Sequence, residues 1–229
     1  MEKGQLYVVA TPIGNLKDIT LRAIEVLKEV DLVACEDTRI TGRLLHHLGI
    51  KKPLISFHQH SRISRTEEIM QRLESGQNVA LVTDSGTPGI SDPGSKLVKR
   101  VLDYGKMRVV SVPGPSAFSA ALSIAGVPSK KILFLGFLPK KKGRQTELFQ
   151  IRDFWRKGFT VVFFESPYRI KKTVRELSSY VKNAELSLFR EMTKKFEEII
   201  TVKLDGNEEE INKIRAQGEF TAVLKAKRK

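Results

Sequence analysis

Short apolar segments alternate with segments of helical periodicity along almost the whole sequence, and this alternation constrains the fold more than any other feature. The apolar segments have the length of buried strands, and the segments between them place apolar residues three or four positions apart. Repeated strand–helix units of this kind fold into sheets with many parallel strands, covered by helices. The sequence therefore predicts an α/β protein.

Apolar runs, caps and turn residues place the individual elements. A capping box at 64–67 predicts a helix that ends at Gly76. Ser166-Pro167 predicts the start of another helix, because proline is favoured at the first helical position. The segment 140–144 is expected to be mobile. Strands are predicted at 5–10, 32–35, 54–56, 78–83, 108–112, 132–135, 160–165, 185–190, 199–203 and 220–226, and helices include 95–104, 116–125, 146–156 and 208–216.

Pro113-Gly114-Pro115 interrupts the alternation near the middle of the chain. Two prolines around a glycine continue neither a strand nor a helix. A chain of 229 residues is long enough for two small α/β domains. We therefore expect an N-terminal domain at 1–112 and a C-terminal domain at 113–229, each a mainly parallel or mixed sheet flanked by helices.

Three loops rich in glycine and proline each follow the end of an expected strand, at 11–15, 84–94 and 113–117. In open α/β sheets, ligands bind at the carboxyl ends of the strands. Glycine permits close approach of a backbone to a ligand, and proline stiffens the loop. A tight βα turn explains any one of these loops, but three at one edge favour a small-molecule site.

Several classes of protein are excluded or disfavoured. The dinucleotide fingerprint G-x-G-x-x-G and the P-loop motif are both absent. The single Cys35 excludes an internal disulfide and a cysteine metal cage, and we expect no metal site. No apolar run is long enough to span a bilayer, and the first residues do not resemble a signal peptide. A cytoplasmic protein without a membrane partner is expected.

The charge is strongly basic and unevenly distributed. Lys and Arg number 40 against 26 Asp and Glu, a net charge of +14, and no acid lies between Asp37 and Glu67 or between Asp103 and Glu147. Such segments suit a polyanion, because neutralised phosphates release counterions. The alternative is a solvated basic surface. The candidate RNA-binding residues are Arg39, Arg43, His58, His60, Arg62, Arg65, Lys140, Lys141, Lys142 and Arg144.

Six segments together resemble one family, in the right order and over nearly the whole chain. They are 6–20 (Leu6-Tyr7-Val8-Val9-Ala10-Thr11-Pro12-Ile13-Gly14-Asn15 onward), Glu36-Asp37-Thr38-Arg39, Ser56-Phe57-His58-Gln59-His60, 83–94, 112–117 and Phe164-Glu165-Ser166-Pro167-Tyr168-Arg169. The sequence resembles the family of ribosomal RNA small subunit methyltransferase I, within the tetrapyrrole methylase superfamily.

The resemblance implies a two-domain fold, usually a homodimer, that binds S-adenosylmethionine in the cleft between its domains. It also implies 2′-O-methylation of a cytidine in 16S rRNA near the decoding centre. Many members continue for several dozen residues beyond the last strand, whereas this sequence stops at Lys229. Any substrate contacts that such an extension makes are expected to be either absent here or supplied by the basic segments.

Residues matched by motif give the expected cofactor contacts. Pro12 lies in the first loop, 11–15. The second loop, 84–94, occupies the position where many relatives read Gly-Gly-Asp. Backbone groups are expected to make most contacts, because these loops have few polar side chains. The cofactor-binding residues implied by the resemblance are Pro12, Asp84, Ser85, Gly86, Gly89, Ile90, Ser116, Ala117, Glu165 and Ser166.

A ribose hydroxyl is a weak nucleophile, so a nearby base should assist the transfer. Glu36 and Asp37 are the catalytic candidates, since both follow the second strand. The alternative for Asp37 is that it caps the next helix. Phe57 and Phe137 are candidate platforms for a flipped cytidine, with core packing as the alternative for both. Two other functions remain open: a small-molecule tetrapyrrole methylase, and a non-catalytic rRNA-binding assembly factor.

Overall fold

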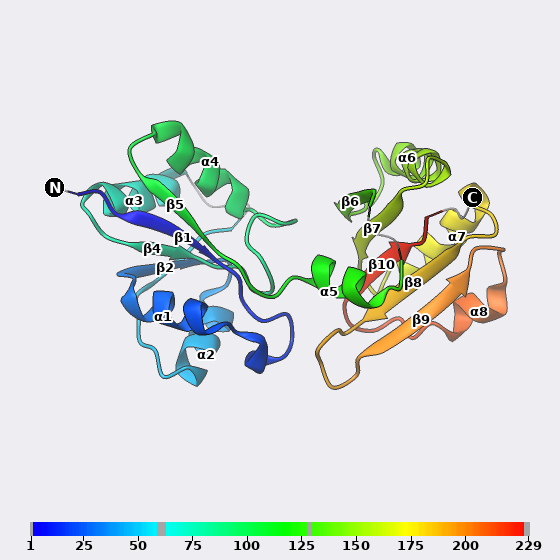
Figure 1. The fold of residues 1–229 in the computed structure, drawn as a ribbon, viewed down its shortest axis with the longest axis horizontal. Coiled ribbons are helices and arrows are strands. Elements are labelled where there is room, and N and C mark those ends of the chain that lie inside the picture. Colours follow the sequence, from blue (N-terminus) through cyan, green and yellow to red (C-terminus); the bar gives the residue numbers. More distant parts are fainter. Residues whose placement is uncertain (1, 59–62, 128–129, 227–229) are drawn as a thin grey trace. The chain divides into compact units, whose positions relative to one another are not determined.

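The structure is a computed structural model that describes residues 2–58, 63–127 and 130–226. The chain divides into two compact units, Met1–Ser116 and Ala117–Lys229. Each unit contains one five-stranded sheet with helices packed on it (Figure 1). The predicted α/β class is confirmed.

The first unit is a parallel sheet in the order β3-β2-β4-β1-β5. Helices α1 and α2 cover one face, and α3 and α4 cover the other (Figure 1). The elements are β1 (Gln5–Val9), a 3-10 turn η1 (Leu16–Asp18), α1 (Leu21–Glu29), β2 (Leu32–Cys35), α2 (Thr38–His47), β3 (Leu54–Ser56), α3 (Ile63–Glu74), β4 (Val79–Leu81), α4 (Gly94–Tyr104) and β5 (Arg108–Val112).

Two hydrophobic clusters stabilise this sheet, one on each face. Val33 packs with Leu27 of α1, whereas its neighbour Ala34 packs with Met70 of α3 and Leu97 of α4. Successive strand residues point to opposite faces, so a strand buried on both sides must be apolar throughout. This explains why β2 is apolar at every position.

The second unit is a mixed sheet in the order β6-β7-β10-β8-β9. Strands β6 and β7 are parallel, whereas β7–β10, β10–β8 and β8–β9 are antiparallel. Its core gathers Ile151 of α6, Phe163 of β7 and Val174 of α7. The elements are α5 (Ala117–Ile124), β6 (Ile132–Phe137), α6 (Arg144–Arg156), β7 (Thr160–Glu165), α7 (Ile170–Tyr180), β8 (Glu185–Arg190), β9 (Glu198–Lys203), α8 (Glu208–Lys213) and β10 (Phe220–Leu224).

The first unit ends after Ser116, not at the expected residue 112. Gly114 packs so closely on Ala10 that an added Cβ would lie 3.1 Å from the Ala10 Cβ. The hydroxyl of Thr87 also donates to the Pro115 carbonyl at 3.1 Å. These contacts attach the Pro-Gly-Pro turn to the first sheet.

The helix predicted to begin at Ser166-Pro167 begins instead at Ile170. The Ser166 carbonyl accepts hydrogen bonds from the amides of Arg169 and Ile170, both at 3.1 Å, which closes a turn before the helix. The Ser166 hydroxyl accepts from Arg169 Nε at 3.2 Å. The prediction of a helix start at Ser166-Pro167 was therefore wrong.

Candidate functional site

The loops that follow β1, β2, β4 and β5 lie at the same edge of the first sheet, because all its strands are parallel. This edge carries the residues of the first unit that were predicted to bind a cofactor, namely Pro12, Asp84, Ser85, Gly86, Gly89, Ile90 and Ser116. The strand order thus brings together segments that are far apart in sequence.

Hydrogen bonds between these loops fix their conformation. Thr11 and Gly86 exchange two backbone bonds, N to O at 2.9 Å and 3.1 Å. The Thr11 hydroxyl donates to the carbonyl of Thr83 at 3.0 Å. With the bond from Thr87 to Pro115, the loop after β4 is tied to the loops after β1 and β5.

Asp92 holds the second half of the loop after β4. Its Oδ1 accepts the amides of Gly89 at 2.8 Å and Gly94 at 2.7 Å. Its Oδ2 is buried and lacks a hydrogen-bond partner among the described residues. We did not identify Asp92 or Thr11 from the sequence, although an aspartate between a serine and a proline is a recognisable turn signal.

A cavity of about 210 Å³ opens at this edge of the first unit. Of the predicted cofactor residues, Pro12 and Asp84 line it, and Arg43 was predicted only as an RNA contact. Cofactor pockets usually exceed about 300 Å³, so this cavity is large enough for only part of a nucleoside-sized ligand. The lining residues are Thr11, Pro12, Leu16, Ile40, Thr41, Arg43, Leu44, Thr83 and Asp84.

Three carboxylates lie together beside this cavity. Asp84 Oδ1 accepts the amide of Asp37 at 3.0 Å, and Glu36 Oε2 accepts the Thr83 hydroxyl at 3.3 Å. Burial, and then the neighbouring Asp84 carboxylate, raise the pKa of Glu36. Burial also raises the pKa of Asp84. Both groups are therefore better proton acceptors than an ordinary surface carboxylate.

Asp37 differs from its neighbour Glu36. Its Oδ1 accepts the amide of Arg39 at 2.8 Å and caps helix α2. The Arg39 guanidinium also binds this carboxylate, at 2.6 Å for the closest pair of atoms. These bonds lower the pKa of Asp37 to about 2. Such a carboxylate is a weak base, so the geometry favours the capping role for Asp37 and leaves Glu36 as the candidate base.

Two predicted site residues of the second unit belong to a buried ion-pair network. The Glu165 side chain is fully buried and binds Arg169 Nη2 at 2.7 Å and the Ser166 amide at 2.7 Å. Arg144, only 6% exposed, donates to Thr173 at 2.6 Å and to Glu176 at 2.8 Å. Arg144 is therefore unavailable to RNA, and the Glu165 carboxylate is unavailable to a cofactor. Arg144 is also the first residue of α6, so the expectation that the whole segment 140–144 is mobile was wrong at Arg144.

The other predicted residues have varied surroundings. Ser166 and Ala117 are half-buried. The two stacking candidates differ: Phe57 is buried in the core, which favours the packing alternative, whereas Phe137 is 56% exposed. His60 and Arg62 lie outside the described residues. The remaining candidate RNA contacts are exposed, namely Arg39, Arg43, His58, Arg65, Lys140, Lys141 and Lys142.

The residues the structure describes contain no group of three His, Cys, Asp or Glu side chains that could hold a metal ion. In the same ranges, no helix combines the length and apolar character needed to cross a membrane.

Replacing Gly86 with Val is expected to weaken binding of S-adenosylmethionine about tenfold. Gly86 has φ of +87°, and an added Cβ would lie 3.4 Å from Ile13 Cγ2. A side chain in the left-handed region costs about 1–2 kcal/mol, and here the strain falls on the bonds to Thr11. Titration calorimetry measures the effect. Gly105→Val is the control, since Gly105 is also left-handed but lies at the far end of α4. If both variants bind S-adenosylmethionine with the same affinity, the placement of the loop after β4 in the cofactor site is contradicted.

Comparisons with known proteins agree with the fold and the motifs. Residues 5–206 match the family Tetrapyrrole (Corrin/Porphyrin) Methylases. Ribosomal RNA small subunit methyltransferase I of Thermotoga maritima is 42% identical over 98% of this chain and 99% of that protein. The protein of the same name from Bacillus subtilis is 41% identical over 97% of this chain and 75% of that protein.

Solved structures of tetrapyrrole methyltransferases have the same fold. The methyltransferase CobJ superposes with a TM-score of 0.72 at 18% identity, covering 97% of this chain and 94% of that chain. Uroporphyrin-III C-methyl transferase from Thermus thermophilus, complexed with S-adenyl homocysteine, gives 0.69 at 19% identity and covers 97% of both chains. The predicted fold is confirmed, and the chain belongs to the ribosomal RNA small subunit methyltransferase I family, within the tetrapyrrole methylases.

Proposed function

We propose that the protein transfers a methyl group from S-adenosylmethionine to 16S ribosomal RNA, at the 2′-hydroxyl of a cytidine near the decoding centre. One observation carries the proposal. In a chain of this family, the loops after β1 and β4, which are bonded to one another, line a cavity together with helix α2, next to Glu36, a carboxylate with a raised pKa.

The residues at this edge fit the cofactor chemically. Bound S-adenosylmethionine supplies an electrophilic methyl group on a positively charged sulfur. Asp84 in the cavity lining offers a carboxylate for its positive and hydrogen-bond-donating groups, and so does Asp92, whose Oδ2 has no partner within the described part of the chain. Pro12 and the fixed backbone at Gly86 supply a rigid surface against which a nucleoside can pack. We propose Pro12, Asp84, Ser85, Gly86, Gly89, Ile90, Ser116, Ala117 and the backbone at Glu165 and Ser166 as the contacts.

Glu36 is proposed to accept the proton of the attacking ribose hydroxyl. Its carboxylate is held by Thr83, which also lines the cavity. Asp84 is proposed to contact the cofactor and, by its charge, to keep the pKa of Glu36 raised. Orientation of the two reactants in a rigid site supplies much of the remaining acceleration.

The net charge favours RNA over a small tetrapyrrole. A charge of +14 suits a polyanion, whereas a single acidic tetrapyrrole needs only a few cations. The relatives named for ribosomal RNA are 41–42% identical to this chain, and the tetrapyrrole enzymes are 18–19% identical. A tetrapyrrole substrate would give an activity that is nearly independent of salt.

Incubation of small-subunit rRNA with isotope-labelled S-adenosylmethionine tests the function. Mass spectrometry of the digested nucleosides is expected to show label in 2′-O-methylcytidine. Label in a base or in another nucleoside would contradict the proposed position. The absence of label, both with naked RNA and with assembled subunits, would contradict the activity itself.

We also propose a cytoplasmic location and a homodimer. Light scattering of the purified protein tests the homodimer.

Arg39 is proposed to contact an RNA phosphate, since its side chain is 87% exposed at the site edge. Arg39→Gln should weaken RNA binding a few-fold and lower the slope of log K against log salt by about 0.7. The backbone amide of residue 39, which donates to Asp37, is unchanged in this variant. Arg43 is not used for the test because it lines the cavity. Filter binding over a salt series measures both quantities. The control is Lys106→Gln, at an exposed lysine in the turn before β5, at the opposite edge of the sheet. An equal slope of log K against log salt in the two variants would refute the contact between Arg39 and a phosphate.

A further inference from the structure

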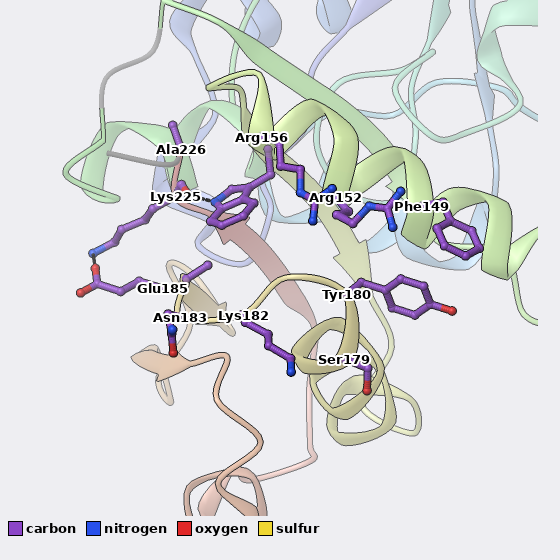
Figure 2. Close-up of a pocket in the computed structure, with 12 residues that line it drawn as sticks. Phe149, Arg152, Arg156, Ser179, Tyr180, Lys182, Asn183, Glu185, Lys225 and Ala226 are labelled. Carbon is purple, nitrogen blue, oxygen red and sulfur yellow. Dashed lines mark hydrogen bonds and ion pairs between the residues drawn. The ribbon is translucent and has the colours of Figure 1, made fainter. Parts of the chain in front are cut away.

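A second and larger groove lies entirely within the C-terminal unit. It has a volume of about 870 Å³ and is formed by the last turns of α6 and α7, the start of β8 and the end of β10 (Figure 2). Its lining combines basic and aromatic side chains. The cofactor loops of the first unit contribute no residue to this groove.

The groove lies at the edge of the second sheet away from Glu165 and Ser166. In the antiparallel pair β7–β10, Glu165 at the end of β7 is opposite Phe220, whereas Leu224 is opposite Val161 near the start of β7. The groove residues Lys225 and Glu185 continue from that far end, where the Lys225 amide donates to the Glu185 carbonyl at 3.0 Å. A ligand in this groove would therefore bind apart from the carboxyl end of β7.

The basic side chains of the groove differ in their ion pairs. Lys225 binds Glu185 at 2.7 Å, which neutralises the acidic residue of the lining (Figure 2). Arg152 is paired with Asp153 at 2.9 Å. Arg156 and Lys182 are exposed and form no ion pair among the described residues. The groove therefore keeps two positive charges that can neutralise a ligand's anionic groups.

The aromatic side chains offer a stacking surface. Phe149 is 44% exposed, and its ring meets that of Tyr180 edge to face, with centroids 5.0 Å apart. The Arg152 guanidinium lies 5.0 Å from the centre of the Phe149 ring. Trp155 also lines the groove and is 8% exposed, and its indole N–H donates to the Lys225 carbonyl at 2.9 Å. An exposed ring beside cations is the arrangement that binds unpaired nucleotides, by stacking and by phosphate contacts.

We propose that this groove binds a single-stranded segment of ribosomal RNA that is separate from the methylated nucleotide. Arg156 and Lys182 contact its phosphates, and Phe149 stacks on one of its bases. The inference rests on the proposed RNA substrate and adds a second contact to it. A single strand is favoured over a duplex, because only unpaired bases expose the faces on which Phe149 can stack.

The single tryptophan of the chain makes the groove directly observable. Trp155 fluorescence is expected to change when an RNA oligonucleotide of about ten nucleotides is added, a length within the usual range of single-strand sites. The double variant R156E/K182E should bind this RNA about tenfold more weakly. Its slope of log K against log salt should fall by about 1.4, or about 0.7 for each lost phosphate contact.

The control variant K195E/K213E makes the same charge change at two exposed lysines of the same unit that are outside the groove. An equal loss of affinity in both double variants would overturn the proposal, because net charge alone would then explain binding. Phe149→Leu should weaken RNA binding about tenfold and leave binding of inorganic polyphosphate unchanged. Unchanged RNA affinity in Phe149→Leu would also overturn it.

Methyl transfer to small-subunit rRNA, measured with the same proteins, separates this proposal from the proposed function. Lower methyl transfer at limiting RNA in R156E/K182E than in K195E/K213E supports the groove. If both variants transfer methyl groups equally and bind RNA with equal affinity, RNA binding in the groove is refuted, whereas the proposed methyltransferase function stands. If the wild-type protein transfers no methyl group to any rRNA, the proposed function fails, whereas the binding measurements still decide the groove.

Discussion

Replacing Glu36 with Gln is expected to lower kcat for methyl transfer by about 100-fold, with almost no change in the affinity for S-adenosylmethionine. General-base assistance contributes about 10²–10⁴-fold to a rate. Glutamine has nearly the same shape and keeps an oxygen for the Thr83 hydroxyl, so the loop geometry should persist. Single-turnover kinetics with saturating cofactor and rRNA measures the chemical step directly.

The pH profile distinguishes a base from a merely structural residue. Burial and Asp84 raise the pKa of Glu36, and a base must be deprotonated to act. The wild-type rate should therefore increase as the pH rises through this raised pKa, and the increase should be absent in Glu36→Gln. Glu25→Gln, at an exposed position of α1, is the matched control. A Glu36→Gln enzyme with the wild-type rate and pH profile would exclude Glu36 as the base.

Asp37 provides an internal comparison. Its pKa of about 2 keeps it ionised throughout the range in which the enzyme can be assayed. Asp37→Asn should therefore retain the increase in rate with pH, even if the changed cap loosens the first turn of α2. Loss of that increase in Asp37→Asn would assign the base to Asp37 instead.

Short apolar runs bounded by turn residues were the most predictable part of the fold. Strands β2, β3 and β5 have the predicted bounds, because an apolar run between turn residues leaves little freedom in placing them. Strand β4 (Val79–Leu81) is shorter than the predicted 78–83, and beyond its end the Thr83 carbonyl accepts a bond from the Thr11 hydroxyl of another loop. The sequence pattern could not reveal this cross-loop contact.

Contacts between distant residues explain the wrong predictions. Arg144 follows three lysines and looks like part of a basic surface. What distinguishes it is its ion pair with Glu176, a residue on another helix, in which Arg144 Nη2 lies 2.7 Å from Glu176 Oε2. Phe57 and Phe137 each follow or end a strand, and only the packing shows that Phe57 is buried and Phe137 exposed. The loops at the edge of the first sheet could be placed from the sequence, because glycine and proline determine backbone conformation locally.

Replacing Arg144 with Ala is expected to destabilise the C-terminal unit by about 3 kcal/mol. Removing one partner of a buried ion pair costs about 3–5 kcal/mol, because the remaining charge stays buried. Glu165 keeps its bond to Arg169, which places the cost at the lower end of this range. The Thr173 hydroxyl, which Arg144 binds at 2.6 Å, loses its charged donor, and so does the Pro139 carbonyl.

Urea unfolding followed by Trp155 fluorescence measures this loss, because the only tryptophan lies in the C-terminal unit. The midpoint should fall by about 1–3 M, given a slope of about 1–3 kcal/mol per molar urea. Lys142→Ala, at an exposed lysine two residues away, should change stability by less than about 0.5 kcal/mol. If the two variants unfold at the same urea concentration, Arg144 contributes no more than a surface charge, and the ion-pair network is not what stabilises the turn before α6.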